Sequence, residues 1–93
     1  ITIPDSVTSI VHDAFEGCTS LTSVTVPNSV ASIGNEVFKN CNNLTIVTFL
    51  GDRPKAGEKV FSGASPTVYR QLGTKGWGKT WGGRPVKLIS EKP

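Results

Sequence analysis

The amino-acid sequence predicts a short solenoid of 23-residue repeats, mostly β-strand, closed by a C-terminal cap. Residues 24–46 align with residues 1–23 without a gap, and ten of the 23 positions are identical. Residues 47–69 continue the register of the apolar positions, and the remaining residues, 70–93, break it with Gly and Trp. A repeat of this length cannot bury its apolar face alone, so successive repeats stack and cover one another.

Each repeat is expected to contain a strand with one buried face. In the second repeat, Val24 and Val26 alternate with polar residues, which is the period-two pattern of such a strand. Pro27 then ends the strand, because proline has no N–H to donate to a ladder. A second short extended segment follows and is predicted to place Val30 and Ile33 in the interior.

The turn after this segment is predicted to be a single helical or 3-10 turn over Asn35–Phe38, too short to be stable without packing. Phe38 would fill the interior of its coil, stacked between Phe15 and Phe61. Strands in neighbouring coils lie about 4.8 Å apart, so equivalent residues come to lie directly over one another. The phenylalanines are therefore assigned to the core and not to a binding site.

The two cysteines, Cys18 and Cys41, lie one repeat apart and should be neighbours in adjacent coils. The expected separation of their Cα atoms, about 5 Å, permits a disulfide, but their parallel Cβ vectors suit its geometry poorly. We therefore predict two free, buried thiols that act as small apolar residues. Ala64 takes their place in the third repeat, which a metal ligand would not allow, so no metal or other cofactor is expected.

Residues 70–93 are predicted to cap the last coil. Thr74 would N-cap a short helix that places Trp77 and Trp81 on one face, four residues apart. Large apolar side chains are what a cap needs to cover the open end of a repeat array. An apolar segment, Val86–Ile89, would then add a closing strand. The alternative use of the tryptophans is an exposed aromatic platform for sugars.

No catalytic residue is expected. His12 is the single histidine, and its equivalents in the later repeats are Asn35 and Glu58, so the position indicates a solvent-facing turn. Asp13 and Glu36 resemble the carboxylate pair of a glycosidase, but the third repeat has a lysine at this position. No phosphate-binding or dinucleotide-binding glycine motif occurs. The chain is therefore expected not to be an enzyme.

The charge is divided unevenly between the two halves of the chain. Residues 1–46 carry a net charge of −3, and residues 47–93 carry a net charge of +6. The basic residues form no helical stripe and no nucleic-acid motif, so nucleic-acid binding is not expected. No apolar run approaches the roughly 18–20 residues that span a bilayer. Because Ile1 lies inside a repeat, we expect the chain to be the C-terminal piece of a longer protein.

The repeated segments IPDSVTSI, AFEGCTSLTSVTVP and VFKNCNNLT resemble the BspA-like leucine-rich repeats over residues 1–69. The resemblance implies a right-handed leucine-rich-repeat solenoid of three coils (1–23, 24–46 and 47–69), with a parallel sheet on its concave side. The tail is similar to the closing segment of such arrays. The resemblance also implies a secreted or cell-surface bacterial protein that binds proteins of a host or of a neighbouring cell.

The candidate partner-binding residues lie on the strand face that points away from the core. One row of this face is expected to contain Thr2, Thr25 and Thr48, and the neighbouring row Ser23, Ile46 and Tyr69. Exposed aromatic and aliphatic groups among threonines are typical of a binding hot spot. The candidate residues are therefore Thr25, Ile46, Thr48 and Tyr69. The alternative is that threonine is simply the favoured polar residue on an exposed strand.

The expected function is a non-catalytic protein-interaction or adhesion module. One alternative is a purely structural spacer and terminator of a longer repeat array, and another is glycan binding by the basic, tryptophan-bearing cap. We also expect self-association through the first coil, because no cap covers its apolar end.

Overall fold

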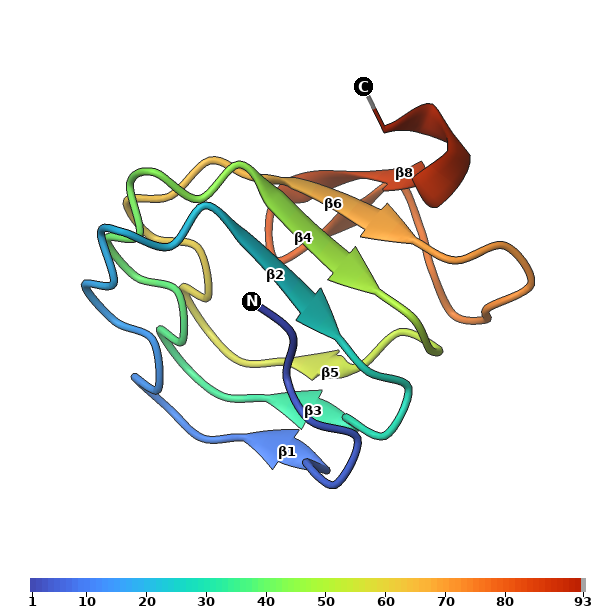
Figure 1. Ribbon diagram of the computed structural model, residues 1–93, viewed down its shortest axis with the longest axis horizontal. Helices are drawn as coiled ribbons and strands as arrows, with labels where there is room; N and C mark the ends of the chain where they lie inside the picture. Colours follow the sequence, from blue (N-terminus) through green and yellow to red (C-terminus); the bar gives the residue numbers. More distant parts are fainter. Residues whose placement is uncertain (93) are drawn as a thin grey trace.

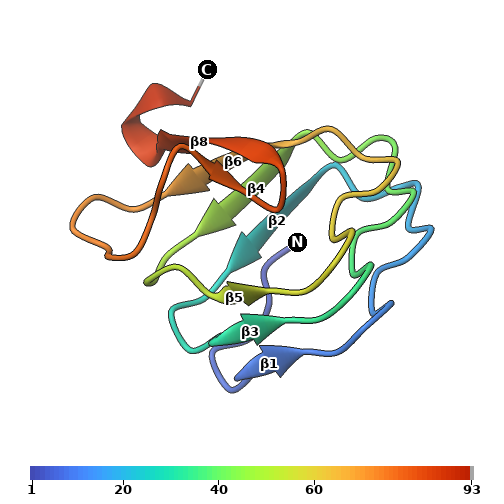
Figure 2. The same cartoon turned by 180° about the vertical axis from the view of Figure 1, so that it is seen from behind.

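The computed structural model describes residues 1–92 as two mainly parallel sheets on opposite sides of one core (Figure 1). The larger sheet has the strand order β2-β4-β6-β8-β7, with the bounds β2 Ser23–Val26, β4 Ile46–Phe49, β6 Thr67–Arg70, β7 Thr80–Trp81 and β8 Arg84–Leu88. The smaller sheet, seen from behind in Figure 2, has the order β1-β3-β5, with the bounds β1 Ser9–Ile10, β3 Ser32–Ile33 and β5 Lys55–Ala56. A 3-10 helix, η1, spans Ile89–Glu91.

Strand pairing repeats the sequence period in the first two repeats. Thr25 lies beside Thr48 in the larger sheet, a shift of 23 residues. A single bridge joins Thr2 to Thr25 with the same shift, and Ile10 lies beside Ile33 in the smaller sheet. The two extended segments predicted for the second repeat are therefore confirmed as β2 and β3.

The register changes in the third repeat. Tyr69 lies beside Thr48, a shift of 21 residues, and Thr67 lies beside Ile46. The prediction that Tyr69 continues the row of Ser23 and Ile46 is therefore wrong. The segment from Phe61 to the start of β6 is two residues shorter than the segment from Phe38 to the start of β4. It includes Pro66, which is buried.

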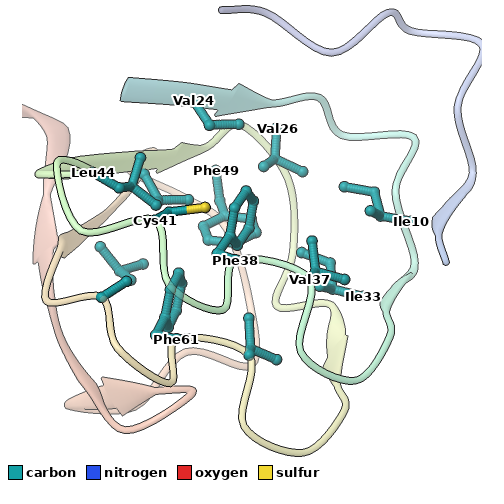
Figure 3. Packing of buried hydrophobic residues seen from close by; sticks show 14 of the residues in the cluster. Ile10, Val24, Val26, Ile33, Val37, Phe38, Cys41, Leu44, Phe49 and Phe61 are labelled. Atoms are coloured by element: carbon teal, nitrogen blue, oxygen red, sulfur yellow. The ribbon is translucent and has the colours of Figure 1, made fainter. Parts of the chain in front are cut away.

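The core between the sheets is a stack of aromatic and β-branched side chains (Figure 3). Phe15, Phe38 and Phe61 stack face to face, with 5.5 Å between successive ring centroids. Phe38 and Val37 are fully buried, and Figure 3 shows Phe38 between Cys41 and Val37. The predicted phenylalanine stack is confirmed. Each fully buried side chain of this size contributes about 1.5–3 kcal/mol to stability.

The turns that carry these phenylalanines contain no helix, so the helical or 3-10 turn predicted at Asn35–Phe38 is wrong. Each turn contains two left-handed residues, and at the first of them φ is 61° in Asp13, 58° in Glu36 and 53° in Lys59. A left-handed residue interrupts helical hydrogen bonding. Isolated bonds between residues three apart remain, such as the one from Lys39 N–H to the Glu36 carbonyl oxygen, and other N–H groups in these turns of the first two repeats donate to carbonyl oxygens of the next repeat.

The cap consists of β7 and β8. Trp81 is buried, its Nε1 donates to the Pro54 carbonyl oxygen at 3.0 Å, and its ring meets the Phe61 ring edge-on at 5.7 Å. The helix predicted from Thr74 is wrong, because Gly76 adopts a φ of 87° and breaks any helical path to Trp81. The predicted closing strand is confirmed as β8, which pairs with β6.

Candidate functional site

The larger sheet has one buried face and one outward face. The side chains of Val24, Val47 and Val68 point into the core and are at most 1% exposed. Successive residues of a strand point to opposite faces, so the residues directly before and after each valine in its strand point away from the core. This outward face contains all the candidate partner-binding residues.

The strand register defines two rows of side chains on the outward face. The first row contains Thr2, Thr25, Thr48, Tyr69 and Lys87. The second row contains Ser23, Ile46 and Thr67. Three of the four candidate residues therefore form one continuous row, and the fourth, Ile46, lies in the row beside it. Neighbours within a row are about 4.8 Å apart along the sheet.

The candidate residues differ in exposure. Thr48 and Tyr69 are only 4% and 5% exposed, although they lie on the outward face, whereas Thr25 and Ile46 are partly exposed. The Nζ atom of Lys92 lies 5.5 Å from the centre of the Tyr69 ring, in a cation–π contact. The accessible part of the face is therefore centred on Thr25 and Ile46, and the expected exposed aromatic group is absent from it. Nothing in the sequence pattern indicated that Lys92 returns to Tyr69.

Sequence reasoning missed a groove of about 420 Å³ along the smaller sheet. Gly34 and Gly57 lie in this groove, one repeat apart. A Cβ atom at Gly34 would lie 2.7 Å from the backbone N of His12, and one at Gly57 would lie 2.6 Å from the backbone N of Asn35. The recurrence of glycine at this position was the available signal. These glycines allow adjacent repeats to approach closely, so their role is structural.

Both cysteines are free thiols, as predicted. Cys41 is fully buried, and its Sγ donates to the Phe15 carbonyl oxygen at 3.0 Å, whereas Cys18 is only partly buried. Burial raises the pKa of the Cys41 thiol above its ordinary value. A thiol held in its protonated form is a poor nucleophile, which suits the predicted packing role of Cys41.

The charged side chains of the turns form exposed pairs. Lys39 Nζ lies 3.0 Å from a carboxylate oxygen of Glu36 and 3.8 Å from one of Glu16, and the hydrogen bond and charge of Glu36 raise the pKa of Lys39. His12 is exposed, with Nδ1 3.4 Å from Asp13. Exposed pairs of this kind contribute little to stability. In the described part of the chain, no three His, Cys, Asp or Glu residues are placed to hold a metal ion.

Parallel rungs in a 23-residue register, with stacked phenylalanines and a closing strand, define the class of leucine-rich-type repeat proteins. A family model described as "BspA type Leucine rich repeat region (6 copies)" matches residues 1–72, so the chain belongs to this family. Such repeat modules typically serve protein interaction in secreted or surface proteins of bacteria. No curated protein and no solved structure matches the chain. Over residues 1–92, no helix has the length and apolar character needed to cross a membrane.

Proposed function

We propose that this chain is a non-catalytic module that binds another protein through the outward face of the larger sheet. The setting proposed for it is a secreted or cell-surface bacterial protein built as a right-handed solenoid, of which this chain forms three coils and a cap. One observation supports the proposal above the others: two regular rows of side chains stand on a sheet whose opposite face is fully packed. A rigid surface of this kind loses little conformational entropy when a partner binds.

The accessible part of the face is neutral and combines hydroxyl with aliphatic groups. Thr25 and Ile46 are partly exposed, Thr67 lies beside Ile46, and Leu50 is exposed at the end of β4. Lys87 continues the first row at the end that belongs to the basic half of the chain. A partner surface with an apolar centre and an acidic rim toward Lys87 would complement this arrangement.

The glycan-binding alternative has less support. Trp81 is 1% exposed, and its Nε1 is already bonded to the Pro54 carbonyl oxygen. Trp77 is partly buried, with its ring 5.1 Å from that of Phe49 and its Nε1 3.3 Å from the Gly51 carbonyl oxygen. Stacking of a sugar needs an open aromatic face, and both indoles are used in closing the core.

The test is a binding screen of the immobilised chain against secreted and cell-surface proteins of host and neighbouring cells, followed by surface plasmon resonance. Ile46→Asp and Thr25→Asp are each expected to weaken a detected interaction by about tenfold or more, as charges placed in a hot spot do. Leu72→Asp is the matched control, because Leu72 is 80% exposed and lies outside the sheet. Binding that survives both changes on the sheet would assign the partner to another surface. An absence of any hit would favour the spacer and terminator alternative.

A further inference from the structure

The turns that lead from the smaller sheet to the larger sheet carry hydrogen bonds between successive repeats. In the first two repeats, three alternate N–H groups of each turn donate to carbonyl oxygens of the next repeat. The pairs of the first turn, at 3.0, 3.0 and 2.8 Å, are Asp13 to Asn35, Phe15 to Val37 and Gly17 to Lys39. Those of the second turn, at 2.9, 2.9 and 2.7 Å, are Glu36 to Glu58, Phe38 to Val60 and Asn40 to Ser62. Each of these turns therefore satisfies its donors with an acceptor segment of the repeat that follows.

The turn of the third repeat has the same donors but no acceptor for them. The equivalent N–H groups are those of Lys59, Phe61 and Gly63, which we call the donor row, and none of them donates to an acceptor in residues 1–92. The backbone conformation is unchanged, since φ is 53° at Lys59 and 75° at Gly63, against 58° at Glu36 and 60° at Asn40. The donor row therefore points toward the cap, as the donors of the second repeat point toward the third.

The N–H group of Phe61 has the greatest need of an acceptor. Phe61 is only 5% exposed, and buried backbone N–H groups without a partner are rare because each one costs free energy. Lys59 and Gly63 are exposed, so the donor row is open to solvent at both ends. A ligand that carries acceptors can therefore approach the row along its length and satisfy a buried polar group that the chain itself leaves unpaired.

The cap covers the ring of Phe61 but supplies no acceptor to the donor row. The ring of Trp81 meets the Phe61 ring edge-on at 5.7 Å, and a Cβ at Gly82 would lie only 3.0 Å from it. At the next residue, Gly83, a Cβ would meet no atom within 4 Å. The hairpin thus fills the place above the ring, where a further coil would need to lie. Its glycine tip leaves access for a single extended segment.

The charges near the donor row favour an anionic ligand. Lys59 is exposed at one end of the row. Arg84 lies beyond the other end, past Gly63, where its Nε donates to the Pro66 carbonyl oxygen at 2.8 Å. Neither basic side chain belongs to any of the ion pairs formed within residues 1–92. One carboxylate, that of Glu58, adjoins the row in the sequence, so two cations stand against one anion.

We infer that the donor row binds an extended, acidic peptide segment of a partner protein. The acceptors inside the chain supply the template, because they are carbonyl groups of alternate residues in one segment, such as Asn35, Val37 and Lys39. A peptide in this orientation accepts hydrogen bonds from all three donors and brings its carboxylates toward Lys59 and Arg84. Main-chain hydrogen bonds give such a complex its affinity, and the charges select the partner. This site lies outside both sheets and is separate from the outward face of the larger sheet.

The experiment adds the peptide acetyl-Asp-Thr-Gly-Thr-Asp-amide to the ¹⁵N-labelled full chain and follows the backbone amides by NMR. Threonine favours the extended conformation, and the central glycine leaves room beside the cap hairpin. The amide protons of Lys59, Phe61 and Gly63 should shift downfield, and their exchange with solvent should slow by about tenfold or more at saturation. The comparison ligands are acetyl-Lys-Thr-Gly-Thr-Lys-amide and inorganic phosphate, and neither should protect all three amides.

The variant Lys59→Glu tests the charge of the site without disturbing the fold. Glutamate already occupies the equivalent left-handed position in the second repeat, as Glu36, so the turn accepts this change. Lys59→Glu should weaken peptide binding by about tenfold or more. Lys75→Glu is the matched control, because it makes the same change of charge beside the loop that follows β4, where the Lys75 N–H donates to Asp52. The control should alter the Kd by less than about twofold.

Three results would overturn the inference. They are the absence of any shift at about 1 mM acidic peptide, equal binding of the lysine peptide, and equal protection of the three amides by phosphate, which would indicate a simple anion site. Shifts confined to Thr25 and Ile46 would also refute it and would assign the peptide to the outward face of the larger sheet. The effect of Ile46→Asp on a protein partner bears only on the proposed function, so failure of either proposal can be recognised separately.

Discussion

Phe38 illustrates how much a single side chain contributes when it lies in the middle of a stack. Its ring contacts one ring below and one above, each 5.5 Å away between centroids, and none of its surface is exposed. The Cys41 thiol lies beside it and donates to the backbone of the first repeat. Removal of this ring would leave a cavity bordered by three repeats, with little room for the backbone to collapse.

Phe38→Ala is therefore expected to lower the free energy of unfolding by about 3–5 kcal/mol. Phe38→Leu should cost less, because most of the volume is kept. Urea unfolding followed by tryptophan fluorescence measures both changes. Leu72→Ala serves as the control and should stay within about 0.5 kcal/mol of the parent chain, because its side chain is exposed. A loss below about 1 kcal/mol for Phe38→Ala would contradict the continuous stack.

At the scale of an element, the conformation of the turns is determined by left-handed residues that recur in every repeat. Their left-handed residues recur at two positions, and the second position contains Gly17, Asn40 and Gly63, with φ of 71°, 60° and 75°. Glycine and asparagine are the residues that most readily adopt this conformation. The left-handed residues therefore keep the turn from continuing as a helix, and several of its N–H groups are available to donate to carbonyl oxygens of the next repeat.

Gly17→Ala is expected to destabilise the chain by about 1 kcal/mol, through left-handed strain alone. No atom lies within 4 Å of a Cβ placed there, so steric contact contributes nothing. Gly78→Ala is the matched control, since its Cβ would also meet open space while its φ is not positive. The control should be neutral or slightly stabilising. Thermal unfolding of the two variants, compared with the parent, separates the effects; equal melting temperatures would contradict the assignment.

The two cap tryptophans provide a further test at this scale. Trp81→Phe removes a buried hydrogen-bond donor from the Pro54 carbonyl oxygen and should cost about 1–3 kcal/mol. Trp77→Phe should cost less, because Trp77 is only partly buried and its hydrogen bond to Gly51 is longer, at 3.3 Å. Urea unfolding followed by circular dichroism measures both variants without depending on the altered fluorophore. The reverse order of the two losses would contradict the cap described above.

These elements also show which parts of the fold follow from sequence. The strands and the phenylalanine stack could be predicted, because identical residues 23 apart place Phe15 under Phe38 and mark the same inward positions. The turn conformation could not be predicted, since the residue types of a short segment such as Asn35–Phe38 are compatible both with a helical turn and with a turn that contains a left-handed residue. The row assignment of Tyr69 failed because a two-residue shortening leaves the apolar pattern almost intact. The contact of its ring with Lys92 is likewise one that no local pattern encodes.

At the scale of the whole molecule, two raised pKa values make the stability of the fold decrease at alkaline pH. Burial raises the pKa of the Cys41 thiol, and the hydrogen bond that Lys39 donates to the Glu36 carboxylate raises the pKa of Lys39. A group whose folded pKa is raised stabilises the fold fully below its unfolded pKa, and this contribution is lost as pH rises through the folded value. The contribution of Cys41 is the larger one, because Lys39 is solvent-exposed and its pair is screened.

The melting temperature is therefore expected to be steady between about pH 6 and 8 and to fall above about pH 8.5, where the unfolded thiol ionises. Cys41→Ala should flatten this decline, although it lowers the melting temperature at neutral pH by leaving space in the core. Val37→Ala is the control, because it also leaves space in the buried core but removes no ionisable group, so its decline should stay parallel to that of the parent chain. Calorimetry over this pH range measures the slopes, and a parallel decline in Cys41→Ala would exclude the thiol as its cause.

The antiparallel hairpin of β7 and β8 has one more consequence for the molecule in concentrated solution. Sheets polymerise when a long, flat edge strand offers its unpaired peptide groups to another chain. Here the outermost strand, β7, is only two residues long, and two left-handed glycines, Gly82 and Gly83, follow it directly. The larger sheet thus ends on this side in a short, sharply turned edge that offers few unpaired peptide groups to another chain, so we expect sheet-to-sheet association through the capped end to be disfavoured even at high concentration.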